Sequence, residues 1–240
     1  MRKIKIALYQ SRLKGFLPKP VLKVLSKARP DFLGLPEYFF SNPKAAKLSD
    51  LARDFDRNMA YLTTLSLGLP HTVLIGGTLI KEEGGLFFNE SPILYQGKLL
   101  GEYKKNKLFG KEIGDITPGG AYEVFEVKGV KIAVLICADV LHDEGFDALA
   151  RKKPDLVFIP TFSPYKEEGA WEKNNRDKNI YVEGAKRLES WVIKICGVKT
   201  RGIYPIQGRS LIAGPSGVLW RVPFHREGEE VLKITRLEIN

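Results

Sequence analysis

Strand patterns and helix patterns take turns along the chain, and this order constrains the fold more than any other feature. Alternating apolar and polar residues predict a first strand over residues 3–10, and helical spacing follows over residues 21–28. A second strand is expected over residues 31–37. Apolar residues then recur every three or four positions from Leu48 to Leu65, which is typical of a helix with one buried face.

Strands outnumber helices in the rest of the chain. We expect further strands over residues 71–80, 85–96, 98–105, 122–127, 131–137, 155–160, 191–198, 208–214, 217–222 and 231–239, and helices near 145–153 and within 170–189. Gly97 and Gly129 supply tight turns between neighbouring strands. Hairpins mixed with βα units favour an α/β sandwich of two sheets covered by helices over a doubly wound parallel sheet. No repeat or linker divides the chain, so residues 1–240 are expected to form one domain.

Composition narrows the functional classes. Hydrophobic residues make up 44% of the 240-residue chain and charged residues 28%, values that suit a globular protein rather than a disordered one. The net charge of +10 leaves nucleic-acid binding open as a minor alternative, but lysines and arginines stand beside acids in stretches such as WEKNNRDKN, which favours a solvated helix face. Two cysteines and the lack of an apolar run of about 20 residues predict a cytoplasmic protein outside the membrane.

Two of the expected strands end in charged residues suited to catalysis. Glu37 lies within LGLPEYFF, where apolar neighbours would desolvate the carboxylate and raise its pKa toward the range of a general base; a surface acid is the alternative. In GEYKKNKLF, strand alternation puts Lys105 and Lys107 on one face with Tyr103, and Lys104 on the other. A lysine on the buried face could stabilise an oxyanion, whereas an exposed charge run is the alternative.

A third strand ends at a cysteine. Cys137 closes the apolar run VKIAVLIC, and Asp139 follows two residues later. Most cysteines in apolar strands are inert core residues, and Cys196 in WVIKICGV fits that description. A thiol near a buried cation, however, ionises below its usual pKa of about 8.5. From these residues alone, both core filling and nucleophilic catalysis remain open for Cys137.

Taken together, the three fragments resemble the nitrilase, or carbon–nitrogen hydrolase, superfamily. The matching segments are LPEYFF, YKKNKLF and LICADVLHDE, and KIALYQ, NESPILYQGKLLGEYKK, TPGG and GRSLIAGPSGVLW extend the resemblance over almost the whole chain. The resemblance implies a four-layer α-β-β-α sandwich. It also implies a homodimer or higher homo-oligomer, a small-molecule amide substrate, no nucleic-acid or membrane partner, and no metal or organic cofactor.

The same resemblance implies a mechanism. Glu37 would accept the thiol proton, and the Cys137 thiolate would attack an amide carbonyl or a nitrile carbon. Lys105 and the backbone N–H of Ala138 would hold the developing oxyanion. An acyl-enzyme would form with release of ammonia or an amine, and water activated by Glu37 would then hydrolyse it.

Three further residues match the family's site. Glu112 in LFGKEIG corresponds to a second glutamate that orients the lysine, with a surface loop acid as the alternative. Thr161 and Phe162 match a segment that often lines the substrate pocket.

The chain departs from the family's pattern at a few positions. Lys107 replaces a frequent histidine, and His142 and Asp143 replace a Phe-Pro pair. Extra charge at Lys107 would favour an anionic substrate or would face solvent. Ala138, where true nitrilases tend to have tryptophan, and the short chain favour an amidase that acts on a small amide or carbamoyl compound. Nitrile hydrolysis and a non-catalytic interaction protein are the alternatives.

Overall fold

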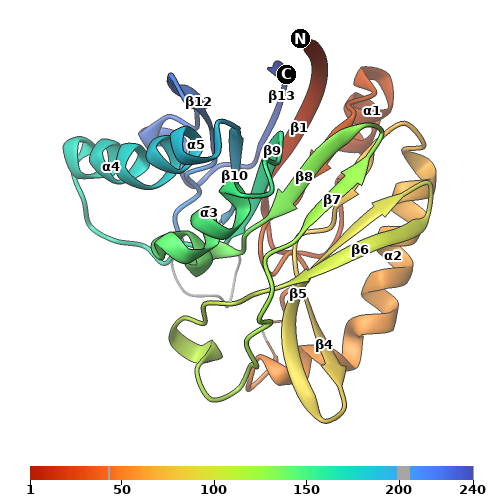
Figure 1. The fold of residues 1–240 in the computed structure, drawn as a ribbon. Helices are drawn as coiled ribbons and strands as arrows, with labels where there is room; N and C mark the ends of the chain where they lie inside the picture. Colours follow the sequence, from red (N-terminus) through yellow and green to blue (C-terminus); the bar gives the residue numbers. More distant parts are fainter. Residues whose placement is uncertain (43, 199–205, 240) are drawn as a thin grey trace.

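Two β-sheets lie face to face between two layers of helices. The computed structural model describes residues 1–42, 44–198 and 206–239. Figure 1 shows one helical flank with α1 and α2 and the opposite flank with α3, α4 and α5. The bounds of these helices are Lys19–Ala28, Phe55–Gly68, Asp143–Ala150, Ala170–Asp177 and Glu183–Leu188. The expected α/β class and four-layer α-β-β-α sandwich are confirmed.

The first sheet runs in the order β4-β5-β3-β2-β1, with β6 paired to β5 and β13 to β1. Its strands span Arg2–Arg12 (β1), Phe32–Gly34 (β2), Val73–Ile75 (β3), Leu79–Glu83 (β4), Leu86–Tyr95 (β5), Lys98–Lys104 (β6) and Val231–Ile239 (β13). The second sheet runs β7-β8-β9-β10-β11-β12. Its strands span Val124–Val127, Val130–Val134, Leu156–Thr161, Trp191–Val198, Leu211–Gly214 and Gly217–Arg221. The sheets join where the end of β1 pairs with the end of β10.

Apolar side chains fill the space between the sheets and beneath the helices. Between the sheets, the rings of Phe32 on β2 and Phe158 on β9 lie with their centroids 6.0 Å apart. On the outer face of the first sheet, Leu33 packs with Leu25 of α1 and Leu62 of α2, all fully buried. Phe32 and Leu33, neighbours on β2, are thus buried on opposite faces of the sheet. Burying each such side chain contributes about 1.5–3 kcal/mol to stability.

One expected strand is broken, and the break shapes the site. Residues 71–80 form β3 and β4 with a turn between them rather than a single strand. Gly77 in this turn has a φ of +72°, and a Cβ there would lie 2.4 Å from the carbonyl oxygen of Pro36. Only glycine permits this approach. The turn therefore packs directly against the loop that carries Glu37.

Two expected helices are also divided. The stripe that begins at Leu48 forms a 3₁₀ turn, η1 (Ser49–Asp54), before α2, and residues 170–189 contain a π-helical turn, η4 (Lys178–Val182), between α4 and α5. The longest helix in the described ranges, α2, has 14 residues, short of the length a bilayer-spanning helix requires.

The charged residues of α4 are solvated as expected, with one exception. Five of the nine residues of WEKNNRDKN are exposed, but its Asp177 is buried and pairs with Arg209 at 2.8 Å. Lys173 pairs with Glu227 at 2.9 Å. The side of α4 that faces the second sheet thus holds an ion-pair network, because burial of a charge requires a partner.

Candidate active site

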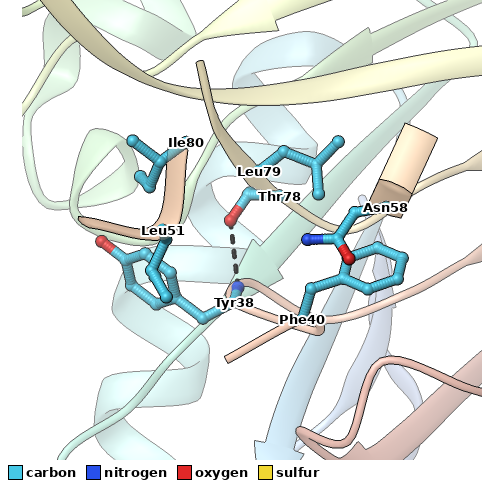
Figure 2. A pocket seen from close by; sticks show the side chains of 7 residues that line it. All are labelled: Tyr38, Phe40, Leu51, Asn58, Thr78, Leu79 and Ile80. Atoms are coloured by element: carbon cyan, nitrogen blue, oxygen red, sulfur yellow. Dashed lines mark hydrogen bonds between the residues drawn. The ribbon is translucent and has the colours of Figure 1, made fainter. Parts of the chain in front are cut away.

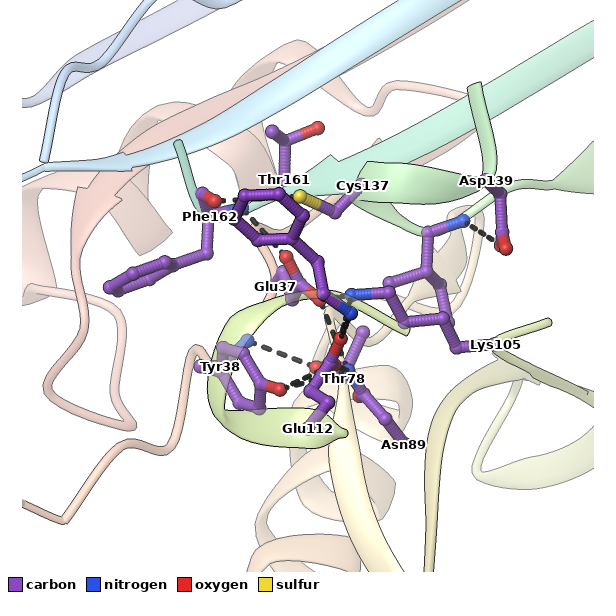
Figure 3. A network of polar contacts seen from close by, with 12 residues as sticks. Glu37, Tyr38, Thr78, Asn89, Lys105, Glu112, Cys137, Asp139, Thr161 and Phe162 are labelled. Carbon is purple, nitrogen blue, oxygen red and sulfur yellow. Dashed lines mark hydrogen bonds and ion pairs between the residues drawn. The ribbon is translucent and has the colours of Figure 1, made fainter. Parts of the chain in front are cut away.

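The residues expected at three strand ends meet at one end of the sandwich. Glu37 follows β2, Lys105 follows β6 and Cys137 follows β8. The Lys105 Nζ lies 2.8 Å from Glu37 Oε1 and 2.7 Å from Glu112 Oε2. Glu37, Lys105 and Glu112 are at most 3% exposed, so these charges are removed from water together. Figure 3 shows the four side chains converging.

The backbone presents Cys137 in a strained conformation. Cys137 begins a 3₁₀ turn, η3 (Cys137–Leu141), and has a φ of +46°, in the left-handed region that non-glycine residues seldom adopt. Its Sγ donates a hydrogen bond to the Phe162 carbonyl oxygen at 3.4 Å. The Phe162 N–H in turn donates to Glu37 Oε2 at 2.8 Å. The backbone of Phe162 therefore holds the thiol and the carboxylate side by side.

The charges of the site set the proton positions at rest. Burial raises the pKa of Glu37, and Lys105 opposes that rise. Burial and then the Glu37 charge raise the pKa of the Cys137 thiol, and together they outweigh Lys105. Lys105 does lower the pKa of this thiol, but the net lowering expected from the sequence is wrong for the resting site. The thiol keeps its proton, and Glu37 is the adjacent group able to accept it.

Two residues that were not predicted tie the glutamates together. The Asn89 Nδ2 donates to Glu37 Oε1 at 3.0 Å and to Glu112 Oε1 at 2.8 Å, and the Tyr38 hydroxyl donates to Glu112 Oε1 at 2.6 Å. No signal in the residue pattern distinguished Asn89, which the structure places on β5 with its carbonyl oxygen accepting the Lys105 N–H at 2.9 Å. Both carboxylates accept hydrogen bonds from these side chains, which reduces the repulsion between their charges and lets them lie close together.

A small cavity lies behind Tyr38. Its volume is about 10 Å³, room for one water molecule, and Figure 2 shows the side chains around it. The Tyr38 N–H donates to Thr78 Oγ1 at 3.0 Å across this region. That bond fastens the residue next to Glu37 to the turn that contains Gly77.

Asp139 connects the lysine segment to the nucleophile turn. Its Oδ1 accepts the N–H groups of Asn106 at 3.0 Å and Lys107 at 2.7 Å. Its Oδ2 accepts the Tyr103 hydroxyl and the Ile136 N–H, both at 2.8 Å. The side chain is fully buried. In the sequence Asp139 was notable only as the acid two residues after Cys137, but in the structure its hydrogen bonds connect the segment after Lys105 to the turn that carries Cys137.

Replacing Asp139 with asparagine should weaken both the fold and the site. One asparagine oxygen cannot accept four hydrogen bonds, and its NH₂ group would face two donors. We expect a loss of about 1–3 kcal/mol in the free energy of unfolding and a kcat at least roughly tenfold lower, with little change in KM. Thermal unfolding and steady-state ammonia release measure these effects. Asp143→Asn is the control, because the Asp143 side chain is 81% exposed. An unchanged kcat in a destabilised Asp139→Asn variant would limit Asp139 to a structural role.

The site opens into a large pocket. Its volume is about 860 Å³, and its lining includes Glu37, Lys105, Glu112, Cys137 and Phe162. Two other predicted residues lie beside it rather than in its lining. Ala138 is buried in η3, and the Thr161 hydroxyl donates to the Ile159 carbonyl oxygen at 3.0 Å.

The residues that depart from the family's pattern lie outside this lining. Lys107 was expected on the same strand face as Lys105, but β6 ends at Lys104 and the Lys107 ammonium pairs with Glu144. Asp143 pairs with Arg187 on the surface. Because Glu144 neutralises Lys107, that position gives no reason to expect an anionic substrate.

A second cluster of charges lies on the opposite face of β5 and β6. Glu83, Glu90 and Glu102 bring carboxylate oxygens within 4.8 Å of one another. The Lys81 ammonium lies among them, 2.7 Å from Glu83 and 2.9 Å from Glu102, so the cluster already contains its cation. Glu90 is 1% exposed, and its nearest cation, Lys81, is 3.8 Å away. Burial, and then the Glu102 charge, raises the pKa of Glu90 to about 8.

Glu90→Gln should therefore stabilise the protein at alkaline pH. The folded state keeps the Glu90 proton up to about pH 8, whereas the unfolded state releases it near pH 4.5. The contribution of Glu90 to stability is therefore complete below pH 4.5 and is lost as the pH rises through about 8. At pH 9 we expect the free energy of unfolding of the variant to exceed that of the wild type by about 1–3 kcal/mol. The difference should be smaller at pH 5. Urea unfolding across this range tests it, with the exposed neighbour Glu82→Gln as the control. A difference independent of pH would contradict it.

The chain is also similar to known proteins. A model of the carbon–nitrogen hydrolase family matches residues 27–236. The chain is 30% identical over 160 residues to the glutamine-dependent NAD⁺ synthetase of Acinetobacter baylyi, covering 65% of this chain but only 29% of the synthetase. It is 23% identical over 225 residues to the nitrilase of Pyrococcus abyssi, covering 91% and 81% of the two chains.

A solved structure shows the same fold. The amidase from Nesterenkonia sp. AN1, with the acetamide moiety of fluoroacetamide on its active-site cysteine, superimposes with a TM-score of 0.78 at 20% identity. The match covers 98% of this chain and 90% of the amidase. The fold is thus that of the nitrilase superfamily.

Proposed function

The chain belongs to the carbon–nitrogen hydrolase family, and on this premise we propose that it hydrolyses the C–N bond of a small amide or carbamoyl compound. One observation carries the proposal: Lys105 lies 2.8 Å from Glu37, and the backbone of Phe162 holds the Cys137 thiol beside the same carboxylate. A nucleophile, a base and a fixed cation therefore lie next to one another at the base of the pocket. These are the groups that acyl transfer through a thioester requires.

In the first half-reaction, Glu37 takes the thiol proton as the Cys137 sulfur bonds to the amide carbon. The carbonyl oxygen becomes an oxyanion, which the Lys105 ammonium and the Ala138 N–H stabilise. The C–N bond then breaks, and the departing nitrogen takes the proton from Glu37. Ammonia or an amine leaves, and the acyl group remains on Cys137 as a thioester.

In the second half-reaction, Glu37 accepts a proton from water, which attacks the thioester carbon. The C–S bond breaks, the carboxylic acid forms, and the Cys137 thiolate recovers its proton from Glu37. Glu112, held by Asn89, keeps Lys105 aimed at the oxyanion in both halves. Burial raises the pKa of Glu37, which makes this carboxylate a better proton acceptor than an exposed glutamate.

An ammonia-release screen tests the proposal. It would include short aliphatic amides, ω-amides of dicarboxylates, N-carbamoyl amines and nitriles. We expect release from at least one amide or carbamoyl compound. Release from nitriles alone would favour the nitrilase alternative, to which the name of the Pyrococcus abyssi relative points. No release from any compound would favour a non-catalytic interaction protein.

The assembly and location are proposals as well. We propose a single-domain cytoplasmic homodimer that acts on a small molecule and binds no nucleic acid or membrane. The two cysteines, Cys137 and Cys196, are both free thiols, which suits a reducing compartment. Sedimentation equilibrium would report the oligomeric state. Strong salt-dependent retention on DNA would contradict the absence of a nucleic-acid partner.

A further inference from the structure

The pocket in front of Cys137 is larger than a short amide needs. Its volume of about 860 Å³ lies near the upper end of the range for sites that enclose drug-sized ligands. A substrate such as propionamide would leave most of it filled with water. The walls beyond the reacting groups therefore bear on which acyl group the site accepts.

These walls are largely apolar. Large apolar side chains from three segments line them: Leu48, Leu51, Phe109, Ile113, Phe162 and Tyr165. Three of the six are more than half exposed, at 54% for Phe109, 70% for Ile113 and 59% for Tyr165. Grouped exposed apolar side chains beside a reactive centre mark a surface that gains from contact with an apolar ligand.

The charges in the pocket do not favour a carboxylated substrate. At its base, Glu37 and Glu112 oppose the single ammonium of Lys105. Lys47 and Lys111, the other cations of the described lining, are exposed to solvent. An ion pair with such a group improves binding by at most about fivefold, whereas each buried methylene contributes up to about fourfold. A chain of several methylenes therefore outweighs a terminal carboxylate.

We propose that the pocket selects amides with an uncharged, medium-length aliphatic acyl chain, which lies along the wall formed by Leu48, Leu51, Phe109, Ile113 and Tyr165. This inference rests on the proposed amidase function. It adds the class of acyl group to that function. The carbonyl carbon would stand at Cys137, and the chain would extend outward over the exposed apolar side chains.

The test is a series of kcat/KM values for ammonia release from propionamide, butyramide, pentanamide and hexanamide. We expect an increase of about 10- to 60-fold from the first to the last, from two- to fourfold per methylene. Succinamate should react more slowly than 4-methylpentanamide, in which an isopropyl group replaces the carboxylate. A flat or falling series, or a preference for succinamate, would overturn the inference and leave the amidase function standing. No ammonia from any amide would overturn both.

A pair of variants distinguishes loss of contact between the acyl chain and the pocket wall from a general loss of activity. Ile113→Ala should reduce the ratio of kcat/KM for hexanamide to that for propionamide by about three- to tenfold. The ratio is the readout because a distorted active site would lower both values together. Leu219→Ala is the matched control, since Leu219 is 52% exposed on β12 and outside the pocket lining. An unchanged ratio in Ile113→Ala would contradict the placement of the chain.

Discussion

Replacing Cys137 with alanine is expected to lower kcat/KM for amide hydrolysis by at least roughly 10⁴-fold. The thiol is the only side chain that bonds to the substrate carbon in the proposed reaction, so no other side chain can complete the acyl transfer. The fold should persist, because the Cys137 side chain is only partly buried and the substitution removes a single sulfur atom. Ammonia release and thermal unfolding measure the two effects.

Cys196 provides the matched control. It is fully buried on β10 and lies outside the pocket lining. Cys196→Ala should keep most of the activity, and iodoacetamide should label Cys137 but not Cys196 in the wild-type protein. Undiminished hydrolysis by Cys137→Ala, or labelling of Cys196 in its place, would remove the nucleophile from this account.

Replacing Lys105 with methionine should damage activity and stability together. The change leaves Glu37 and Glu112 buried without their cation, which we expect to lower the free energy of unfolding by about 3–5 kcal/mol. The oxyanion also loses its charged partner, which should reduce kcat/KM by roughly 10²- to 10³-fold. Urea unfolding and ammonia release give the two values.

Lys104→Met is the control for this prediction. Lys104 precedes Lys105 in the chain but points to the opposite face of β6, where it pairs with Glu83. It should retain activity. The double variant Lys105→Met/Glu112→Gln removes one unpaired carboxylate, so it should recover stability but not activity. Recovery of activity in the double variant would show that Lys105 acts only by neutralising Glu112.

Residue pattern alone predicted much of the fold. The alternation of strands and helices indicated a two-sheet sandwich, and the order of Glu37, Lys105 and Cys137 at strand ends led to the family. The structure brings those residues together, with Glu112 beside them. Strand ends are informative because the chain leaves the sheet there and its side chains become available to a cleft.

Other features depend on contacts between distant segments, which spacing does not reveal. Asp139 is two residues from Cys137, but its function in the structure follows from Asn106 and Lys107, more than thirty positions away. Asn89 resembled any polar residue in a strand until β5 and β6 paired. The pKa of the Cys137 thiol was misjudged because Lys105 alone was weighed, whereas burial and Glu37 dominate.

The most direct test of the central claim is the mass of Cys137 during turnover. An amide hydrolysed by the protein would be mixed with it, quenched in acid within seconds and digested for mass spectrometry. The account predicts that the peptide containing Cys137 gains the mass of the acyl group, and that hydroxylamine removes this mass. Steady ammonia release without an adduct on Cys137, or with the adduct on another residue, would contradict it.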